Sequence, residues 1–355
     1  MLILGIESSC DDTGASVVED GETVLSSVVW SQDSVHGRFG GVVPELASRN
    51  HISAIVPVVD YALEIAAIKM DDIDGLAVTQ GPGLVGSILV GLSFAKAVSF
   101  ASGVPFAGVN HIEAHAQAAF LREKGEAMTP SPLPLPSGER IKVRGEPGFP
   151  FVSLVASGGH TMLLYCKAPA EFRAIGRTLD DAAGEAFDKV AKMLGLGYPG
   201  GAAIDRAASA GTRDGFGFTR PLMSKDSLDF SFSGLKTAAM THIKKFAGAP
   251  EGDKLNDFAA SFQEAVVDVL VEKSMRALDK TGVKTLVAAG GVACNSRLRE
   301  RLAQMAEGRG FRLFIPPPRF CSDNGAMIAS LGYHLLKKGV RASLDMNAVP
   351  SWDGF

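Results

Sequence analysis

One pattern, present once in each half of the chain, constrains the fold most: an apolar strand, a polar or glycine-rich loop, and a second strand. In the first half, the run Leu2 to Ile6 enters a polar loop, and Ala15 to Val18 follows as a strand. In the second half, Phe151 to Ala156 enters Ser157-Gly158-Gly159-His160, and Thr161 to Tyr165 follows. Short apolar runs bounded by such turn residues predict β-strands. The repetition predicts two divergent copies of one α/β architecture.

Helical and strand periodicity continues after each pair of strands. In the first half we expect the strand Thr23 to Trp30, the helix Pro44 to Ala67, the strand Gly75 to Thr79, a helix that ends near Ala101, the strand Pro105 to Val109 and the helix His111 to Leu121. In the second half we expect helices over 180–194, 202–210, 233–246 and 255–279, the strand Lys284 to Ala289, the helix Asn295 to Glu307, the strand Arg312 to Ile315 and the helix Asp323 to Lys337. The expected domains are therefore a first lobe at 1–122, a second lobe at 151–340 and a tail at 341–355.

Residues 123–150 separate the two expected lobes. Thr129 to Pro150 holds six prolines in 22 residues and patches almost free of apolar side chains, such as Ser137-Gly138-Glu139-Arg140. Such a segment buries too little apolar surface to offset the entropy lost on ordering. We interpret it as a flexible insertion, with a partner-binding arm as the alternative.

Composition excludes several classes of protein. The 355 residues are 46% hydrophobic and 21% charged, so the chain is neither disordered nor fibrous. Cys10, Cys166, Cys294 and Cys321 show no CxxC spacing, which predicts reduced thiols in a cytoplasmic protein. The longest apolar stretch, Gly83 to Ala101, carries polar residues and ends at turn signals. We therefore expect neither a membrane span nor a signal peptide.

Charge is distributed unevenly along the chain. The formal net charge is -4, but residues 1–122 hold 5 Lys+Arg and 14 Asp+Glu, and the remaining residues hold 30 and 25. An acidic first half and a mildly basic second half allow a basic face on the second half. Scattered, solvated charge is the alternative.

The glycine-rich loops are typical of phosphate binding. Glycine lets backbone N–H groups approach phosphate oxygens, and a helix N-terminus adds partial positive charge. Ser157-Gly158-Gly159-His160-Thr161 would hold a phosphate, and Gly290-Gly291-Val292-Ala293-Cys294-Asn295 would lie against the nucleoside. A single Gly-Gly turn is more often only a turn, but loops at matching places in two halves favour a nucleotide between two lobes.

His111 and His115 lie four residues apart on an expected helix, so their side chains share one face. That spacing suits two imidazoles on one metal ion, although helical histidines are often structural. Glu113 lies about 200° around the helix from His111, unlike the glutamate that follows the first histidine in HExxH metalloproteases. The pattern therefore disfavours a zincin mechanism.

A third metal ligand has to come from elsewhere in the chain. Asp323 precedes an apolar helix and is a candidate, with a helix N-cap or first-turn acid as the alternative. Two histidines and one carboxylate would leave coordination positions open for a substrate on iron, zinc or manganese. Further acids beside glycine-bearing segments are Asp11, Asp12, Asp188 and Asp205, each of which could also be a solvated loop residue.

Taken together, the motifs of the chain resemble those of one family over nearly its whole length. They are Gly5-Ile6-Glu7-Ser8-Ser9-Cys10-Asp11-Asp12-Thr13, His111-Ile112-Glu113-Ala114-His115, Ser157-Gly158-Gly159-His160-Thr161, the segment 180–189, Tyr198-Pro199-Gly200-Gly201, the segment 230–237 and Asp323-Asn324-Gly325-Ala326-Met327. The family is TsaD, the bacterial tRNA N6-adenosine threonylcarbamoyltransferases, once called O-sialoglycoprotein endopeptidases. Only the proline-rich insertion departs from the pattern.

The resemblance implies a fold and a set of site residues. The fold would be that of the actin-like ATPases (ASKHA), with two duplicated lobes around a central nucleotide cleft. One divalent metal, usually Fe(2+) with zinc or manganese as alternatives, would be held by His111, His115 and Asp323. Substrate contacts would fall to Val155, Ala156, Ser157, Gly158, Gly159, Asp188, Gly201, Asp205 and Asn295.

The resemblance also implies an activity and partners. The family transfers a threonylcarbamoyl group from threonylcarbamoyl-AMP to N6 of the adenosine beside the anticodon, in tRNAs reading codons that begin with A. A separate synthase supplies threonylcarbamoyl-AMP, and ATP or ADP would fit the same cleft. Bacterial members work with an actin-like paralogue (TsaB type) and a small P-loop ATPase (TsaE type), away from membranes. The attacking nitrogen would lose its proton to Asp11, to Asp12 or to solvent.

Two other classes share these features. An ATP-dependent kinase or ATPase would use the same fold, although Mg-ATP binding does not need a His-His-Asp set. A scaffold whose partner performs the catalysis is the second alternative. Formation of AMP and modified tRNA from threonylcarbamoyl-AMP distinguishes a transferase from both.

Overall fold

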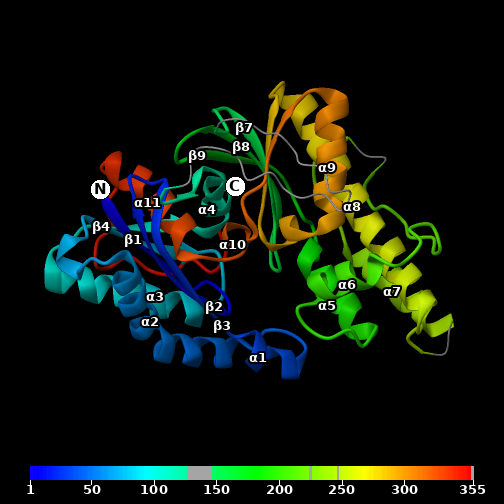
Figure 1. The fold of residues 1–355 in the computed structure, drawn as a ribbon, viewed down its shortest axis with the longest axis horizontal. Coiled ribbons are helices and arrows are strands. Elements are labelled where there is room, and N and C mark those ends of the chain that lie inside the picture. The colour runs from blue at the N-terminus through cyan, green and yellow to red at the C-terminus, as the bar shows by residue number, and fades with distance from the viewer. Residues whose placement is uncertain (126–145, 224–225, 246–247, 353–355) are drawn as a thin grey trace. The chain divides into compact units, whose positions relative to one another are not determined.

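The computed structural model describes residues 1–125, 146–223, 226–245 and 248–352. By contact, the chain divides into two compact units. The first comprises the described parts of Met1–Thr129, Ala168–Phe172 and Pro316–Phe355, and the second comprises those of Pro130–Lys167 and Arg173–Ile315. Each unit contains one β-sheet with its own helices (Figure 1).

The first unit is built on a six-stranded sheet in the order β5-β4-β1-β2-β3-β6. Its strands are β1 (Leu2–Glu7), β2 (Asp12–Glu19), β3 (Thr23–Ser31), β4 (Gly75–Gly81), β5 (Phe106–Asn110) and β6 (Arg122–Glu123). Its helices are α1 (Asp33–His36), α2 (Pro44–Ala66), α3 (Val85–Ser102), α4 (His111–Gln117), α10 (Pro318–Cys321) and α11 (Gly325–Lys337), with short 3-10 turns η1 (Gly37–Phe39), η2 (Met70–Asp72) and η3 (Ala118–Phe120). β1 and β2 are antiparallel, whereas β4 pairs parallel with β1 and with β5.

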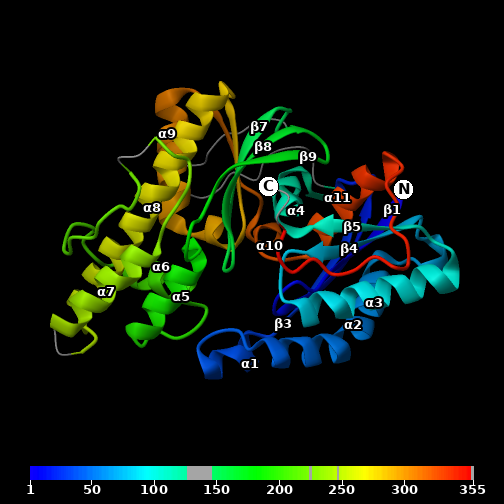
Figure 2. The same ribbon diagram turned by 180° about the vertical axis from the view of Figure 1, so that it is seen from behind.

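The period-2 alternation of β1 separates the two faces of this sheet. Leu4 and Ile6 belong to the cluster that packs against α2 and α3, and Ile3 belongs to the cluster that packs against α11. Gly5 also faces α11, because a Cβ on Gly5 would collide with the backbone of Ala329. Figures 1 and 2 show α2 and α3 along one side of the sheet and α11 along the other. Glu7, two residues after Gly5, therefore ends on the α11 face.

The second unit contains a five-stranded sheet in the order β11-β10-β7-β8-β9. Its strands are β7 (Phe151–Ala156), β8 (Thr161–Ala168), β9 (Glu171–Arg177), β10 (Thr285–Ala289) and β11 (Arg312–Phe314). Its helices are α5 (Ala183–Met193), α6 (Gly200–Ala208), α7 (Ser233–Lys245), α8 (Asp253–Thr281) and α9 (Ser296–Arg309), with the 3-10 turn η4 (Gly291–Cys294). Counted in chain order, the first five strands of each unit are arranged identically, which confirms the predicted duplication.

The structure divides the chain differently from the expected lobes at 1–122 and 151–340. Residues 316–340 join the first unit, because α11 packs on β1, β2 and β4. The expected tail at 341–355 is also attached there: the Ala342 N–H donates to Phe106 O at 2.8 Å, and the Val349 N–H donates to Gln80 O at 2.8 Å. Of the expected insertion at 123–150, residues 126–145 lie outside the described residues.

Several element boundaries also differ from expectation. The helix expected from Asp180 begins only at Ala183, because the Asp180 carboxylate accepts hydrogen bonds from Ser231 Oγ and the Phe232 N–H. The α-helix expected over His111 to Leu121 ends at Gln117 and is followed by the 3-10 turn η3. β9 was not expected, because its sequence EFRAIGR mixes charged and apolar residues.

Helix α3 is the one helix of the described residues that is long and apolar enough to cross a membrane. Core helices of soluble proteins meet the same test of length and composition. Ile88, Leu92 and Ala95 of α3 are buried in the first unit, whereas Val85, Leu89 and Phe100 are exposed. The helix therefore contributes both to the core and to an exposed apolar surface.

Candidate metal centre and substrate-binding residues

His111 and His115 lie in the first turn and a half of α4, directly after β5. The helix begins there because the Asn110 side chain caps it, accepting from the Ile112 N–H at 2.9 Å and from the Glu113 N–H at 3.2 Å. The two imidazole rings lie edge to face with centroids 4.7 Å apart, and both are buried. The spacing of four residues therefore brings the rings onto one helix face, as predicted.

Asp323 completes a group of three potential ligands. Its Oδ1 lies 3.2 Å from His115 Nε2 and 3.5 Å from His111 Nε2. The ligand atoms of the three residues all lie within 4.8 Å of one another, and Glu113 is not part of the group. Asp323 is not the N-cap of α11, because Asn324 Oδ1 accepts the Met327 N–H at 2.9 Å. The structure thus brings together the three predicted ligands across 212 positions of sequence.

The chemistry of His115 fits a metal ligand. Both of its ring nitrogens are buried, and neither has a hydrogen-bond partner of acceptable geometry within the described residues, even though Nε2 is close to Asp323. A buried polar atom without a partner carries a desolvation penalty, which a coordinated cation removes. Burial lowers the pKa of His115, which favours the neutral imidazole that metals bind.

Glu7 contacts His111, and sequence reasoning did not identify it as a functional residue. Its side chain is completely buried at the end of β1, and its Oε2 accepts a hydrogen bond from His111 Nδ1 at 2.9 Å. Burial alone would lower the pKa of His111, but the charges of Glu7 and Asp323 raise this pKa to about 9. Burial likewise opposes ionisation of Glu7, yet His111 holds the pKa of Glu7 below its ordinary value. A charged residue closing an otherwise apolar strand was the signal available in the sequence.

Of the predicted general bases, Asp12 is the first residue of β2 and Asp11 directly precedes it, in the same unit. Burial, together with the charges of Asp323 and Asp11, raises the pKa of Asp12 to about 8. A carboxyl group with a pKa near neutrality can exchange a proton with a substrate at working pH. Asp12 therefore stays a candidate for the general base.

The loop after β7 contains the predicted phosphate-binding residues. The Ser157 N–H donates to His160 O at 2.8 Å, and the His160 N–H donates to Ser157 Oγ at 3.2 Å, which closes a tight turn. Gly158 and Gly159 are exposed, and a Cβ on either would meet nothing within 4 Å. The side chains of Val155 and Ala156 are fully buried, so only their backbone could contact a ligand.

Two further pairs of predicted substrate residues lie close together in the second unit. Asp188 accepts the Gly200 N–H at 2.8 Å, which places it beside Gly201 at the start of α6. Asp205 accepts from Ser296 Oγ at 2.7 Å and from Asn295 Nδ2 at 3.3 Å.

The Asn295 side chain is already occupied in this arrangement. Its Oδ1 caps α9 by accepting the Leu298 N–H at 3.0 Å, and its Nδ2 donates to Gln263 Oε1 at 2.7 Å. Sequence reasoning did not identify Gln263, because it lies within the long helix α8 and the periodicity of that helix says only which face the residue is on. Asn295 therefore holds Asp205 and Gln263 in place, and Asp205 keeps acceptor capacity for a ligand.

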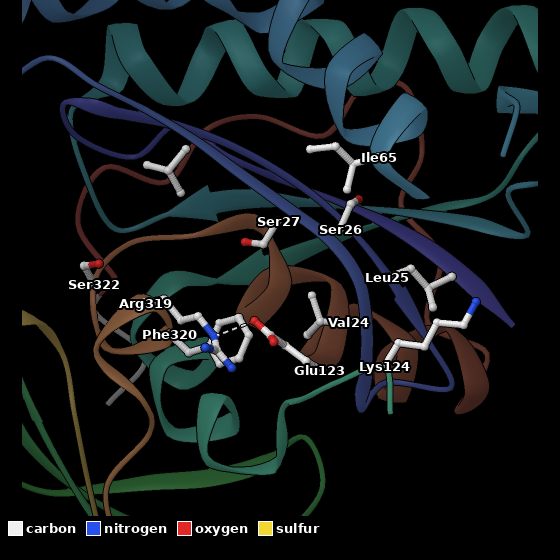
Figure 3. Close-up of a pocket in the computed structure, with 11 residues that line it drawn as sticks. Val24, Leu25, Ser26, Ser27, Ile65, Glu123, Lys124, Arg319, Phe320 and Ser322 are labelled. Carbon is white, nitrogen blue, oxygen red and sulfur yellow. Dashed lines mark ion pairs between the residues drawn. The ribbon is translucent and has the colours of Figure 1, made fainter. Parts of the chain in front are cut away.

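A separate cavity of about 520 Å³ lies in the first unit beside β3 and α10 (Figure 3). Ser26, Ser27, Lys124, Arg319 and Ser322 are among its lining residues, and Arg319 Nε pairs with Glu123 Oε1 at 2.9 Å across it. None of the predicted site residues lines this cavity.

Solved structures share the fold. Component A of (R)-2-hydroxyglutaryl-CoA dehydratase from Acidaminococcus fermentans matches with a TM-score of 0.51 at 17% identity, over 94% of this chain and 98% of that chain. Full-length HypF in its phosphate- and nucleotide-bound form matches with a TM-score of 0.56 at 14% identity, over 96% of this chain and 56% of that chain. With its two sheets of matching strand order, the chain is an α/β protein of the actin-like ATPase fold class that carries a His-His-Asp group.

Sequence comparison then gives the family. The TsaD family model, described as tRNA N6-adenosine threonylcarbamoyltransferase, matches residues 23–144 and 139–330. The enzyme of that name from Geotalea uraniireducens (strain Rf4) is 51% identical over 352 residues, 99% of this chain and 96% of the relative. The one from Syntrophus aciditrophicus (strain SB) is 49% identical over 352 residues, 99% and 97% of the two chains. The chain belongs to the TsaD family, which confirms the resemblance, and it is an acyltransferase of tRNA modification.

Proposed function

We propose that the chain transfers the threonylcarbamoyl group of threonylcarbamoyl-AMP to N6 of the adenosine beside the anticodon, in tRNAs that read codons beginning with A, and releases AMP. The observation that carries the proposal is the intact His-His-Asp group in a chain 51% identical, end to end, to an enzyme of this name. The adenine N6 amine is a poor nucleophile, so the carbamoyl carbon has to be activated. In threonylcarbamoyl-AMP that carbon carries a phosphate leaving group.

His111, His115 and Asp323 would hold one divalent metal, with iron as the first candidate and zinc or manganese as alternatives. The metal would supply Lewis-acid polarisation and orientation of the mixed anhydride. Two imidazoles and one carboxylate leave coordination positions open for such a substrate. Both histidines are buried, so their rings are shielded from bulk water.

Backbone N–H groups of the 157–159 loop would stabilise the departing AMP phosphate. The Ser157 N–H is already engaged by His160 O, so this role falls to the N–H groups of Gly158 and Gly159. Absence of side chains there gives phosphate oxygens unobstructed access to the backbone. Asp188 and Gly201 are proposed to contact the donor, and Asp205 to contact the nucleoside with Asn295 fixing its position.

We assign to Asp12 the role of the base that accepts the proton of the attacking N6 amine, with Asp11 as the second candidate. At neutral pH a carboxyl of pKa about 8 is partly ionised, so it can accept a proton and return it to solvent.

Partners follow from the surfaces of the two units. Ile52, Val56, Tyr61 and Ile65 of α2 are each about half exposed or more, and exposed apolar residues of α3 accompany them. Apolar side chains on the acidic first half suit a protein partner better than phosphates, so we assign Ile52 to Ile68 to the actin-like paralogue. The small P-loop ATPase would join that assembly, and a separate synthase would supply the donor.

The tRNA is assigned to the second unit, whose described surface exposes Arg206, Lys244 and Lys245. Lys236 is a weaker candidate, because its Nζ pairs with Asp181 at 2.8 Å. Proteins that modify tRNA work where tRNA is, so a cytoplasmic location is part of the proposal.

The test is a reaction with the purified chain, its partner subunits, tRNA and threonylcarbamoyl-AMP. The proposal expects AMP and N6-threonylcarbamoyladenosine in equal amounts, and loss of both with the Asp323→Ala chain. Formation of ADP from ATP without modified tRNA would instead indicate a kinase or ATPase. Full transfer by the partners without this chain would indicate a scaffold.

A further inference from the structure

We propose that Glu7 is a positioning residue that fixes the imidazole of His111 for metal binding. This inference rests on the metal centre of the proposed function and concerns a residue outside the predicted ligand set. Glu7 Oε2 lies 2.9 Å from His111 Nδ1, and Ser9 Oγ lies 3.3 Å from the same nitrogen, on the ring edge opposite to the Nε2 that faces Asp323. The ring is thus held between two carboxylates, and only one of them belongs to the predicted ligands.

Glu7 is itself immobilised by the sheet. Its Oε2 also accepts from Thr79 Oγ1 at 2.6 Å, and its Oε1 accepts from the Ser9 N–H at 2.5 Å. Thr79 lies on the neighbouring strand β4, and Ser9 follows β1. Because Glu7 is completely buried, its charge depends on these three donors for compensation.

The hydrogen bond to Glu7 selects the tautomer of His111. A carboxylate accepts but does not donate, so in the neutral ring that a metal binds Nδ1 carries the proton, with Glu7 Oε2 at 2.9 Å and Ser9 Oγ at 3.3 Å beside it. The lone pair of Nε2 is then on the ring edge that faces Asp323. His115 has no comparable partner at Nδ1 within the described residues. The two histidines are therefore unequal: a hydrogen bond at Nδ1 orients His111, whereas His115 has none at Nδ1 within the described residues.

An amide in place of the carboxylate cannot satisfy the same three donors. If the amide oxygen of a Glu7→Gln variant faced His111 and Thr79, its NH2 group would oppose the Ser9 N–H. If the amide turned over, its NH2 group would face His111 Nδ1, which would have to give up its proton. The proton would then occupy Nε2 and block the metal. Either arrangement weakens metal binding with almost no change in side-chain volume.

The experiment measures Zn²⁺ affinity of the full chain by competition with a chelator, without tRNA or donor. Glu7→Gln is expected to lower the affinity about 10- to 100-fold. Glu113→Gln is the matched control, because it makes the same change on α4 outside the ligand group and is expected to leave Zn²⁺ affinity unchanged. In zinc-loaded protein, the His111 Nδ1–H should give a slowly exchanging imidazole proton signal, and Glu7→Gln should shift this signal and speed its exchange.

Thr79 provides a second pair of variants if Glu7→Gln fails to fold. Thr79→Val removes the hydroxyl that holds Glu7 and should lower Zn²⁺ affinity, whereas Thr79→Ser keeps the hydroxyl and should restore it. Equal affinities for both Thr79 variants, or wild-type affinity with an unchanged proton signal in folded Glu7→Gln, would overturn the inference. Zinc loss in His115→Ala with full binding in Glu7→Gln would refute only the role of Glu7. Failure of the wild-type chain to bind zinc would refute the metal centre and the role of Glu7 together.

Discussion

Substituting Gly5 with alanine should disable the metal centre by displacing a helix. A Cβ on Gly5 would lie 2.5 Å from Ala329 N and 2.8 Å from Ala329 Cβ, and it would also collide with Gly325 O. Ordinary contact begins at 3.4 Å, so relief of the Ala329 N clash requires α11 or β1 to move by about 0.9 Å, and relief of the tighter Gly325 O clash requires more. Asp323 precedes α11 and Glu7 follows Gly5 on β1, so the displacement reaches both sides of His111.

That displacement is large on the scale of metal coordination. Ligand distances tolerate only about 0.2 Å of error, so we expect Zn²⁺ affinity to fall at least tenfold in Gly5→Ala. Overpacking of the core should also cost about 1–3 kcal/mol of unfolding free energy. Competition titration and urea unfolding measure the two effects.

Gly308→Ala is the control for this prediction, since a Cβ at this position in α9 meets nothing within 4 Å. It should leave Zn²⁺ affinity unchanged and raise stability by up to about 1 kcal/mol, because glycine is a poor helix former. Wild-type affinity and stability in Gly5→Ala would show that the close approach of α11 to β1 does not position the ligands.

Three further predictions concern the rest of the chain. Glu264 binds Arg297 at 2.6 and 2.8 Å and Arg301 at 2.9 Å. Changing Glu264 to Gln should lower the free energy of unfolding by about 3 kcal/mol, measured by urea unfolding at pH 7. Burial opposes ionisation of Glu264, but Arg297 lowers the pKa of this carboxyl group below its ordinary value. The wild-type chain should therefore lose its extra stability over Glu264→Gln as the pH falls below about 4.5. A stability difference that does not change with pH would contradict the role of this ion pair. Reversing Lys244 and Lys245 to Glu should weaken tRNA binding and flatten its salt dependence in filter-binding assays while partner binding persists; loss of tRNA binding through Ile52 to Ile68 substitutions instead would reverse the assigned surfaces. Removing residues 343–355 eliminates the backbone hydrogen bonds of Val349 to Gln80 and of Pro350 to Gly83, so amide hydrogen exchange over 80–84 should accelerate. Unchanged exchange would show that the segment does not stabilise residues 80–84.

The sequence predicted the elements whose signals are local. The spacing of His111 and His115 needs only the geometry of one helix, and the glycine loop at 157–159 needs only its flanking strands. The shared strand order of the two units likewise follows from repeated local patterns.

Contacts between residues that are far apart in the sequence could not be predicted from local patterns. Nothing near Asp323 in sequence links it to a histidine 212 positions earlier, so residue reasoning made Asp323 only a candidate, with a helix cap as the alternative, and the family resemblance named it a ligand. The return of 316–352 to the first unit depends on the packing of α11 onto Gly5 and Gly14, which no periodicity encodes. Glu7 and Gln263 were missed because a buried polar residue acquires its role from partners on other elements.

The shared metal of His111, His115 and Asp323 is tested most directly by metal analysis of the purified chain. Metal-to-protein ratios are measured for wild type, His115→Ala and Asp323→Ala after identical loading, with thermal unfolding to confirm that each variant is folded. The account predicts one metal per wild-type chain and a sharp loss in both variants, because each removes one of three ligands. A full equivalent of metal in both folded variants would contradict it.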